Sequence, residues 1–218
     1  MVMRVQNDSP PACLTDSTLA RALHDLAARD SFLARLLTAL GPPPLWAREP
    51  GFPTLLHIIL EQQVSLASAR AAFDRLNALA APLTPERFLA LDDATLKAVG
   101  FSRQKTGYGR NLAQALLAGS LDLARVAAAD DDAARVELMQ VKGIGRWTAD
   151  IYLLMALGRP DVWPSGDLAL AVAAQRAFGL AAVPRPEALE AIASGWRPWR
   201  AVAARLLWRY YLSRGAQP

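Results

Sequence analysis

The sequence contains a single cysteine, Cys13, among 218 residues. One thiol excludes an internal disulfide framework and any site built from four cysteines, whether for a metal ion or an iron–sulfur cluster. The histidines, His24 and His57, lie far apart and form no ligand pair. We therefore expect no iron–sulfur cluster and no required cofactor. The lack of a disulfide framework also fits the reducing environment of the cytoplasm.

Long apolar runs are missing as well. No segment approaches the roughly 20 apolar residues that a membrane span requires. The first residues, MVMRVQNDSPPACL, lack the apolar core of a signal peptide, and residues 1–12 are expected to form a flexible N-terminus. Hydrophobic residues nevertheless make up 53% of the chain and charged residues 20%, which suffices for a packed core. We expect a globular protein without a membrane partner.

A strong excess of charge of either sign is also absent. The formal net charge is +4, from 24 lysines and arginines against 20 aspartates and glutamates, and the basic residues are mostly arginine. The planar guanidinium group donates two parallel hydrogen bonds to a phosphate. A composition rich in alanine and arginine also arises from codon bias, so the charge alone leaves nucleic-acid binding open.

No segment alternates apolar and polar residues as a β-strand does. From Leu14 onward, apolar residues recur at helical spacing, and proline or glycine interrupts the pattern at short intervals. The sequence therefore predicts an all-α fold with two helical lobes and a cleft between them. The predicted helices cover residues 16–39, 53–61, 65–80, 85–90, 92–99, 103–118, 121–128, 130–139, 146–157, 167–178, 186–194 and 198–213.

The most informative stretch is LMQVKGIGRWTAD, residues 138–150. Gly143 and Gly145 enclose one apolar residue between two helical segments. Glycine permits a positive φ and a close backbone approach, so this turn can present free N–H groups at the start of the next helix. Those groups and the helix dipole favour a phosphate, and Lys142 and Arg146 add positive charge. An ordinary helix–helix turn is the alternative.

Two further motifs accompany this turn. ILEQQVS precedes it, and VWPSGDL follows it and places Asp167 after a loop rich in glycine and proline. Together the three motifs resemble the helix-hairpin-helix (HhH-GPD) DNA glycosylase superfamily, and within it the 3-methyladenine DNA glycosylase II, or alkylbase DNA glycosylase, branch. The resemblance covers roughly residues 50–213. It implies a glycosylase core over residues 13–218, without the N-terminal β-rich domain of the best-known members and with a cleft that binds DNA.

The resemblance implies that Asp167 is the catalytic carboxylate of an enzyme that releases alkylated bases, such as 3-methyladenine and 7-methylguanine, from duplex DNA. Cleavage of an N-glycosidic bond builds positive charge on the sugar. A fixed carboxylate stabilises that charge and can orient or deprotonate the attacking water. An aspartate after Gly166 is also a good N-cap for the following helix, and the two roles are compatible.

The expected base pocket is aromatic, because a cationic alkylated ring binds well against an electron-rich face. Trp147 and Trp199 match tryptophans of the family pattern, although packing in the core is their alternative role. Gln62, Ile151 and Leu168 complete the expected pocket, and the last two stand where well-known members carry tyrosine. The remaining tryptophans of the C-terminal half are expected to pack in the core: Trp163, Trp196 and Trp208.

The residue at position 147 bears on the reaction type. The bifunctional members of the superfamily, which also cut the strand, carry at this position a lysine that forms a Schiff base. Tryptophan cannot attack the sugar, so the resemblance implies a monofunctional enzyme that uses water. Two alternatives stay open: a bifunctional glycosylase/AP lyase, and a non-catalytic helix-hairpin-helix DNA-binding module. Such a module gains nothing from a carboxylate near phosphates.

Extrusion of a base from the duplex leaves a gap that must be filled. The family places its intercalating residue at the position of Gln63, which the sequence puts in a short break before Ser65; an exposed polar helix end is the alternative.

The C-terminal region contains a run of arginines without an acidic residue between them: Arg197, Arg200, Arg205, Arg209 and Arg214. The run suggests either a basic stripe or a solvated helix face. The residues expected to contact DNA are Gln63, Lys142, Gly143, Gly145, Arg146 and Thr148.

The resemblance also implies a structural cation in the hairpin. Sodium or potassium would be held by the backbone carbonyls of Met139, Val141 and Ile144 and would bridge to a phosphate. The expected partner is double-stranded DNA that contains damaged bases, bound by a monomer. The expected location is the cytoplasm, at the nucleoid through DNA.

Overall fold

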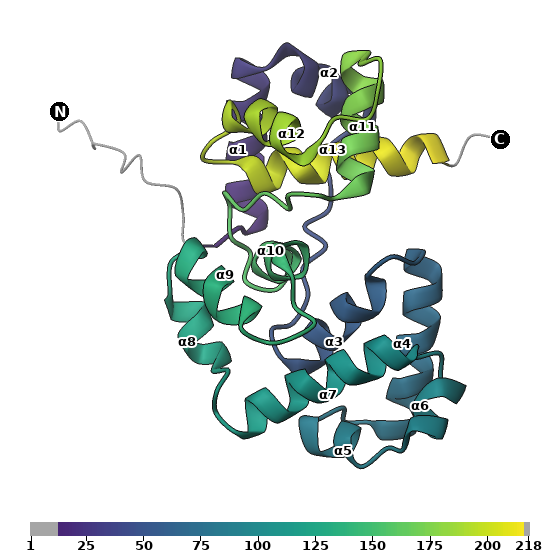
Figure 1. Cartoon of the computed structure of the whole chain (residues 1–218). Helices are drawn as coiled ribbons and strands as arrows, with labels where there is room; N and C mark the ends of the chain where they lie inside the picture. Colours follow the sequence, from purple (N-terminus) through teal and green to yellow (C-terminus); the bar gives the residue numbers. More distant parts are fainter. Residues whose placement is uncertain (1–12, 216–218) are drawn as a thin grey trace. The chain divides into compact units, whose positions relative to one another are not determined.

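The computed structural model describes residues 13–215, with side chains up to residue 213. Residues 1–12, expected to be flexible, lie outside this range, as does the side chain of Arg214. All regular elements among the described residues are helices, which confirms the all-α class (Figure 1). They are α1 (Asp16–Arg29), α2 (Ser31–Leu40), α3 (Phe52–Glu61), α4 (Leu66–Ala80), α5 (Pro85–Leu89), α6 (Asp93–Ala98), α7 (Arg103–Leu117), α8 (Leu123–Ala128), α9 (Asp131–Met139), α10 (Arg146–Met155), α11 (Leu168–Phe178), α12 (Pro186–Ser194) and α13 (Arg200–Gly215).

The single helix predicted over residues 16–39 is wrong, because the chain breaks at Asp30. The Oδ1 atom of Asp30 accepts hydrogen bonds from the backbone N–H groups of Phe32, at 2.9 Å, and Leu33, at 3.1 Å. These bonds satisfy donors that the first turn of α2 leaves without helical partners. The second carboxylate oxygen accepts from Nε1 of Trp196 at 2.8 Å. Asp30 therefore starts α2 and also anchors a distant segment.

The chain divides into two compact units. Unit 2 is continuous, Trp46–Leu157, whereas unit 1 combines the residues up to Leu45 with those from Gly158 onward. Within unit 1, α13 packs against α1, α2, α11 and α12. Within unit 2, α3 packs against α4, α7 and α10, while α9 packs against α8 and α10 (Figure 1). The helix pair α9 and α10, which flanks the predicted hairpin, therefore belongs to unit 2.

The arginines of α13 whose side chains are described do not form an exposed basic stripe. Arg205 is 1% exposed, and its guanidinium donates to the carbonyl oxygens of Leu45, at 2.9 Å, and Ala201, at 3.0 Å. Burial lowers the pKa of Arg205 to about 10. Nε of Arg209 donates to the carbonyl oxygen of Leu40 at 2.7 Å. Arg209 thus ties α13 to the end of α2, and Arg205 ties it to the segment that follows. The sequence gives no sign of these contacts because the partners are backbone carbonyls.

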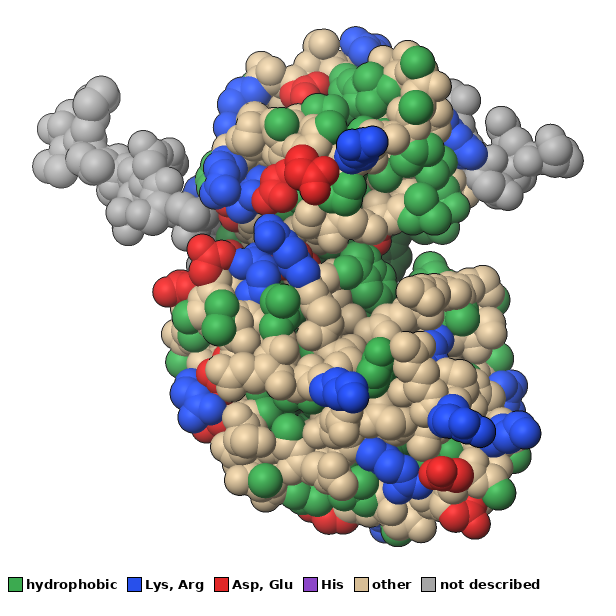
Figure 2. Space-filling model, in the orientation of Figure 1, with side chains coloured by type: hydrophobic (Ala, Val, Ile, Leu, Met, Phe, Trp, Pro, Cys, Tyr) green, Lys and Arg blue, Asp and Glu red, His purple; other side chains and the backbone are tan. Residues whose placement is uncertain are grey.

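Basic and acidic side chains are interspersed on the face of each unit that Figure 2 draws. This distribution agrees with the modest net charge of +4. Among the helices of residues 13–215, none is long and apolar enough to cross a bilayer.

Candidate functional site

The turn between α9 and α10 needs its two glycines for different reasons. Gly143 has a φ of 110°, and a Cβ atom at this position would overlap the side chain of Tyr108. Gly145 has a φ of −91°, and nothing lies within 4 Å of the position that its Cβ would occupy. Glycine at 143 is therefore required by the backbone and by packing. Glycine at 145 leaves open space over the N-terminus of α10.

The turn is held from inside unit 2 and presents charge outward. The amide of Ile144 donates to the carbonyl oxygen of Val141 at 2.9 Å, and Nδ2 of Asn111 donates to the carbonyl oxygen of Lys142 at 3.1 Å. Ile144 and Val141 are buried, whereas Lys142 and Arg146 are exposed. No side chain caps the N-terminus of α10. The open N-terminus with two flanking cations has the chemistry of a phosphate site.

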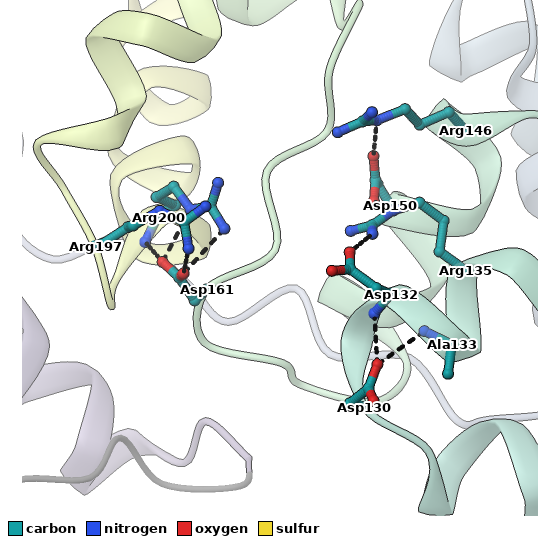
Figure 3. A network of polar contacts seen from close by, with 9 residues as sticks. All are labelled: Asp130, Asp132, Ala133, Arg135, Arg146, Asp150, Asp161, Arg197 and Arg200. Atoms are coloured by element: carbon teal, nitrogen blue, oxygen red, sulfur yellow. Dashed lines mark hydrogen bonds and ion pairs between the residues drawn. The ribbon is translucent and has the colours of Figure 1, made fainter.

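An ion pair that the sequence analysis did not single out joins the helices on either side of the hairpin (Figure 3). Asp150, on α10, is fully buried, and its Oδ1 accepts from Nε of Arg135, on α9, at 2.7 Å. Nε of Arg146 lies 3.7 Å from the other carboxylate oxygen. Because the hairpin connects these two helices, the ion pair between Arg135 and Asp150 helps to fix the conformation of the hairpin.

We expect Asp150→Asn to lower the free energy of unfolding by about 3 kcal/mol, because it leaves the partly buried guanidinium of Arg135 without its buried ionic partner. Urea denaturation measures this change. Asp132→Asn is the matched control, since Asp132 also pairs with Arg135, at 2.5 Å, but its side chain is 96% exposed. The control should leave the free energy nearly unchanged. Equal losses in the two variants would contradict this assignment.

The break between α3 and α4 contains Gln62 and Gln63, as the sequence predicts. Nε2 of Gln62 donates to the carbonyl oxygen of Gly143 and to Oγ1 of Thr148, each at 2.9 Å. Gln62, expected in the base pocket, therefore uses its amide inside unit 2. Thr148, expected to contact DNA, is buried on α10 and does not reach the surface. Gln63 is exposed, with a left-handed φ of 57°.

Asp167 is the N-cap of α11 and belongs to unit 1. Its Oδ1 accepts from the backbone N–H of Leu170 at 2.9 Å and from Nε1 of Trp208 at 3.2 Å. The residue is 8% exposed, and Gly166 before it has a φ of 83°. Two donors on one oxygen hold the carboxylate in a fixed orientation. A fixed carboxylate at a helix N-terminus can stabilise a developing cation without reorganising.

The loop that leads to Asp167 is held by a second carboxylate (Figure 3). Both oxygens of Asp161 accept from the guanidinium of Arg200, at 3.0 and 2.9 Å, and one also accepts from Arg197 at 3.1 Å. The backbone N–H of Arg200 donates to Asp161 as well, at 3.2 Å. Asp161 therefore caps the start of α13, the helix that carries Trp208. Arg197 and Arg200 are accordingly engaged inside unit 1.

The remaining residues of the expected base pocket fall into two groups. Leu168 is 71% exposed beside Asp167, and Trp147 is half-buried. Trp199 is only 2% exposed: its Nε1 donates to Asp25 at 3.2 Å. Ile151 is also buried, on α10. The structure thus gives neither Trp199 nor Ile151 a face on which a base could stack, because packing within unit 1 and unit 2, respectively, has covered them.

Trp208 is a side chain of the candidate site that sequence reasoning missed. We expected simple core packing, and the ring is indeed buried. Its N–H, however, donates to Asp167, which caps a different helix. The spacing of 41 residues between the two carries no periodic signal, so only the packing of α13 against α11 reveals the contact.

Comparisons with known proteins point in one direction. Residues 56–198 match the family model described as "HhH-GPD superfamily base excision DNA repair protein". The chain is 27% identical to alkylbase DNA glycosidase-like protein mag2 of Schizosaccharomyces pombe, over 89% of this chain and 94% of that protein. It is also 27% identical to DNA-3-methyladenine glycosylase 1 of the same organism, over 88% of each. The solved structure of S. pombe 3-methyladenine DNA glycosylase (Mag1) with abasic DNA superposes with a TM-score of 0.82 at 27% identity, covering 86% of this chain and 95% of that one.

Proposed function

The chain belongs to the HhH-GPD superfamily of base excision DNA repair proteins, and from this premise we propose that it hydrolyses the N-glycosidic bond of alkylated bases in duplex DNA. The observation that carries the proposal is the fixed carboxylate of Asp167, held by the backbone of α11 and the indole of Trp208. A DNA-binding module has no need of such a group. The similarity to glycosylases named for alkylbase and 3-methyladenine supports the substrate class.

In the reaction we propose, the bond between the anomeric carbon and the base nitrogen breaks as the base leaves. Positive charge then develops on the deoxyribose, and the carboxylate of Asp167 stabilises it. Water attacks the anomeric carbon, and Asp167 orients it and accepts its proton. An alkylated base is a good leaving group because ring alkylation makes it cationic. One carboxylate therefore suffices, without a strong general acid.

Trp147 supports hydrolysis over strand cleavage. It occupies the position where the resemblance places the Schiff-base lysine of bifunctional members, and its half-buried ring leaves one part open to a base. Leu168 is exposed beside Asp167 and offers an apolar side chain to the base. We do not propose that Trp199 or Ile151 stacks on the base, because both are buried.

The hairpin is proposed to bind the DNA backbone through the N–H groups at the start of α10, with Lys142 and Arg146. The carbonyl oxygens of Met139, Val141 and Ile144 offer the hard donors that sodium or potassium prefers. The carbonyl of Val141 already accepts from Ile144, but a carbonyl oxygen has a second lone pair. The donor set therefore fits a monovalent cation, which would add positive charge facing a phosphate. We propose that a monomer binds double-stranded DNA containing damaged bases.

Incubation with genomic DNA methylated on ring nitrogens tests the proposal. We expect chromatography of the supernatant to detect free 3-methyladenine or 7-methylguanine. The DNA should contain intact abasic sites that break only on heating or in alkali, and borohydride should trap no protein–DNA adduct. Release of no base at all would refute the proposed function. A trapped adduct would instead show that a lysine attacks the sugar.

A further inference from the structure

Gln62 joins the turn that carries Gln63 to the hairpin through its side-chain amide. Its Nε2 lies 2.9 Å from the carbonyl oxygen of Gly143 and 2.9 Å from Oγ1 of Thr148. A backbone carbonyl only accepts, so the nitrogen of the amide must face Gly143, and each of its two hydrogens then has one acceptor. The contact spans 81 residues of sequence.

Each end of this contact is also held by other residues of unit 2. On the hairpin side, Gly143 lies against Tyr108, where even a methyl group would clash. On the other side, Nζ of Lys105 donates to the carbonyl oxygen of Leu60 at 2.6 Å, and Arg48 pairs with the buried carboxylate of Glu61 at 2.8 Å. The end of α3 is therefore held just before Gln62. A shift of the hairpin backbone then changes the position of Gln62, and with it the conformation of the turn.

Gln63, next in the chain, has no such restraint from the hairpin. It is exposed, and its left-handed φ of 57° directs the chain away from the axis of α3. Val64 and Leu66 beside it are exposed as well, at 45% and 61%. The turn therefore presents an amide with apolar neighbours, a combination that suits insertion into an opened base stack.

We propose that Gln62 is a positioning residue that couples phosphate binding at the hairpin to insertion of Gln63 into the gap left by the flipped base. The inference rests on the proposed function and adds to it a link between two contacts that would otherwise be independent. A phosphate bound at the hairpin restrains Gly143. The hydrogen bond from Gln62 transmits this restraint to the turn, so that Gln63 faces the duplex in the orientation that insertion requires.

A mutant cycle tests the link. Gly145→Val perturbs the phosphate site, and Gln63→Ala removes the inserting amide. The readout is insertion, followed by the fluorescence of 2-aminopurine placed next to a tetrahydrofuran abasic site in a duplex. It is measured for each single variant and for the double variant. With Gln62 present, we expect the combined effect to differ from the product of the single effects by about tenfold. With Gln62→Glu, whose second oxygen would face the carbonyl of Gly143, the effects should multiply within about twofold.

Effects that multiply in both backgrounds would overturn the proposal, and so would coupling that survives Gln62→Glu. If the Glu variant does not fold, as judged by its thermal unfolding transition, Gln62→Met removes both donors at similar size and gives the same comparison. The fluorescence does not depend on base release, so an inactive protein that still shows coupling would refute the proposed hydrolysis and leave the link intact.

Discussion

Replacing Asp167 by asparagine is expected to slow base release by a factor of about 100 or more, because it removes the charge that stabilises the cationic sugar in the transition state. The fold should persist, since the Oδ1 atom of asparagine can still accept from the N–H of Leu170 and from Trp208. Affinity for duplex DNA should be unchanged or higher, because a carboxylate near the phosphates is lost. Single-turnover release from a duplex with one 7-methylguanine measures the effect.

The matched control is Asp122→Asn. Asp122 caps α8 by accepting from the backbone N–H groups of Ala124 and Arg125, as Asp167 caps α11 by accepting from that of Leu170. Any small loss of capping energy is therefore similar, and base release should stay at the wild-type rate. Substantial activity in Asp167→Asn, with the control unaffected, would show that the carboxylate is not the catalytic group.

The second large effect is expected for Gly145→Val. The backbone at this position suits any residue, and nothing lies within 4 Å of the position that a Cβ atom would occupy, so the variant should fold. Its branched side chain would occupy the space over the N-terminus of α10 and push a phosphate away. We expect affinity for every duplex, damaged or not, to fall about tenfold or more, the loss of a charge-assisted hydrogen bond worth about 1.5 to 3 kcal/mol. Fluorescence anisotropy at one fixed salt concentration measures the change.

Gly195→Val controls for the substitution itself. Gly195 also has an ordinary φ, −68°, and only a carbonyl oxygen at 3.7 Å lies near the position of a Cβ atom. Binding should be unaffected there. A loss at Gly145 that appears only with damaged duplexes would contradict a backbone contact, because phosphates carry no information about the base.

The sequence predicts most helices because their ends carry local signals. Ser65, Thr84 and Asp130 each accept a hydrogen bond from the first turn of the helix that they precede, and residues of these types are good N-caps. The break at Asp30 had the same signal and was nevertheless missed, because apolar residues continue at helical spacing on both sides of it. A capping residue within an unbroken apolar pattern is ambiguous without the structure.

The residues of the candidate site also differ in whether local sequence or distant contacts determine their environment. Asp167, Gln63 and the hairpin glycines occur in short motifs, so the sequence alone places them. For Trp199 the sequence leaves core packing open as an alternative, and for Ile151 and Thr148 it carries no local sign of burial, because burial depends on which face of a helix meets a neighbour distant in sequence. The partners of Asp167 and Gln62 were missed for the same reason: each bond joins residues tens of positions apart.

The discontinuity of unit 1 determines when each part of the enzyme can form during synthesis. Unit 2 occupies one uninterrupted stretch, so the ribosome delivers all of its helices before Asp167 emerges. Unit 1 must wait for α13, the helix on which α1, α2, α11 and α12 all pack. Its early helices therefore stay without their partner while more than a hundred residues are translated between Leu45 and Gly158. The hairpin can thus form before Trp208 arrives to hold Asp167, so the carboxylate that we propose for catalysis is fixed only after the turn that we propose for DNA binding.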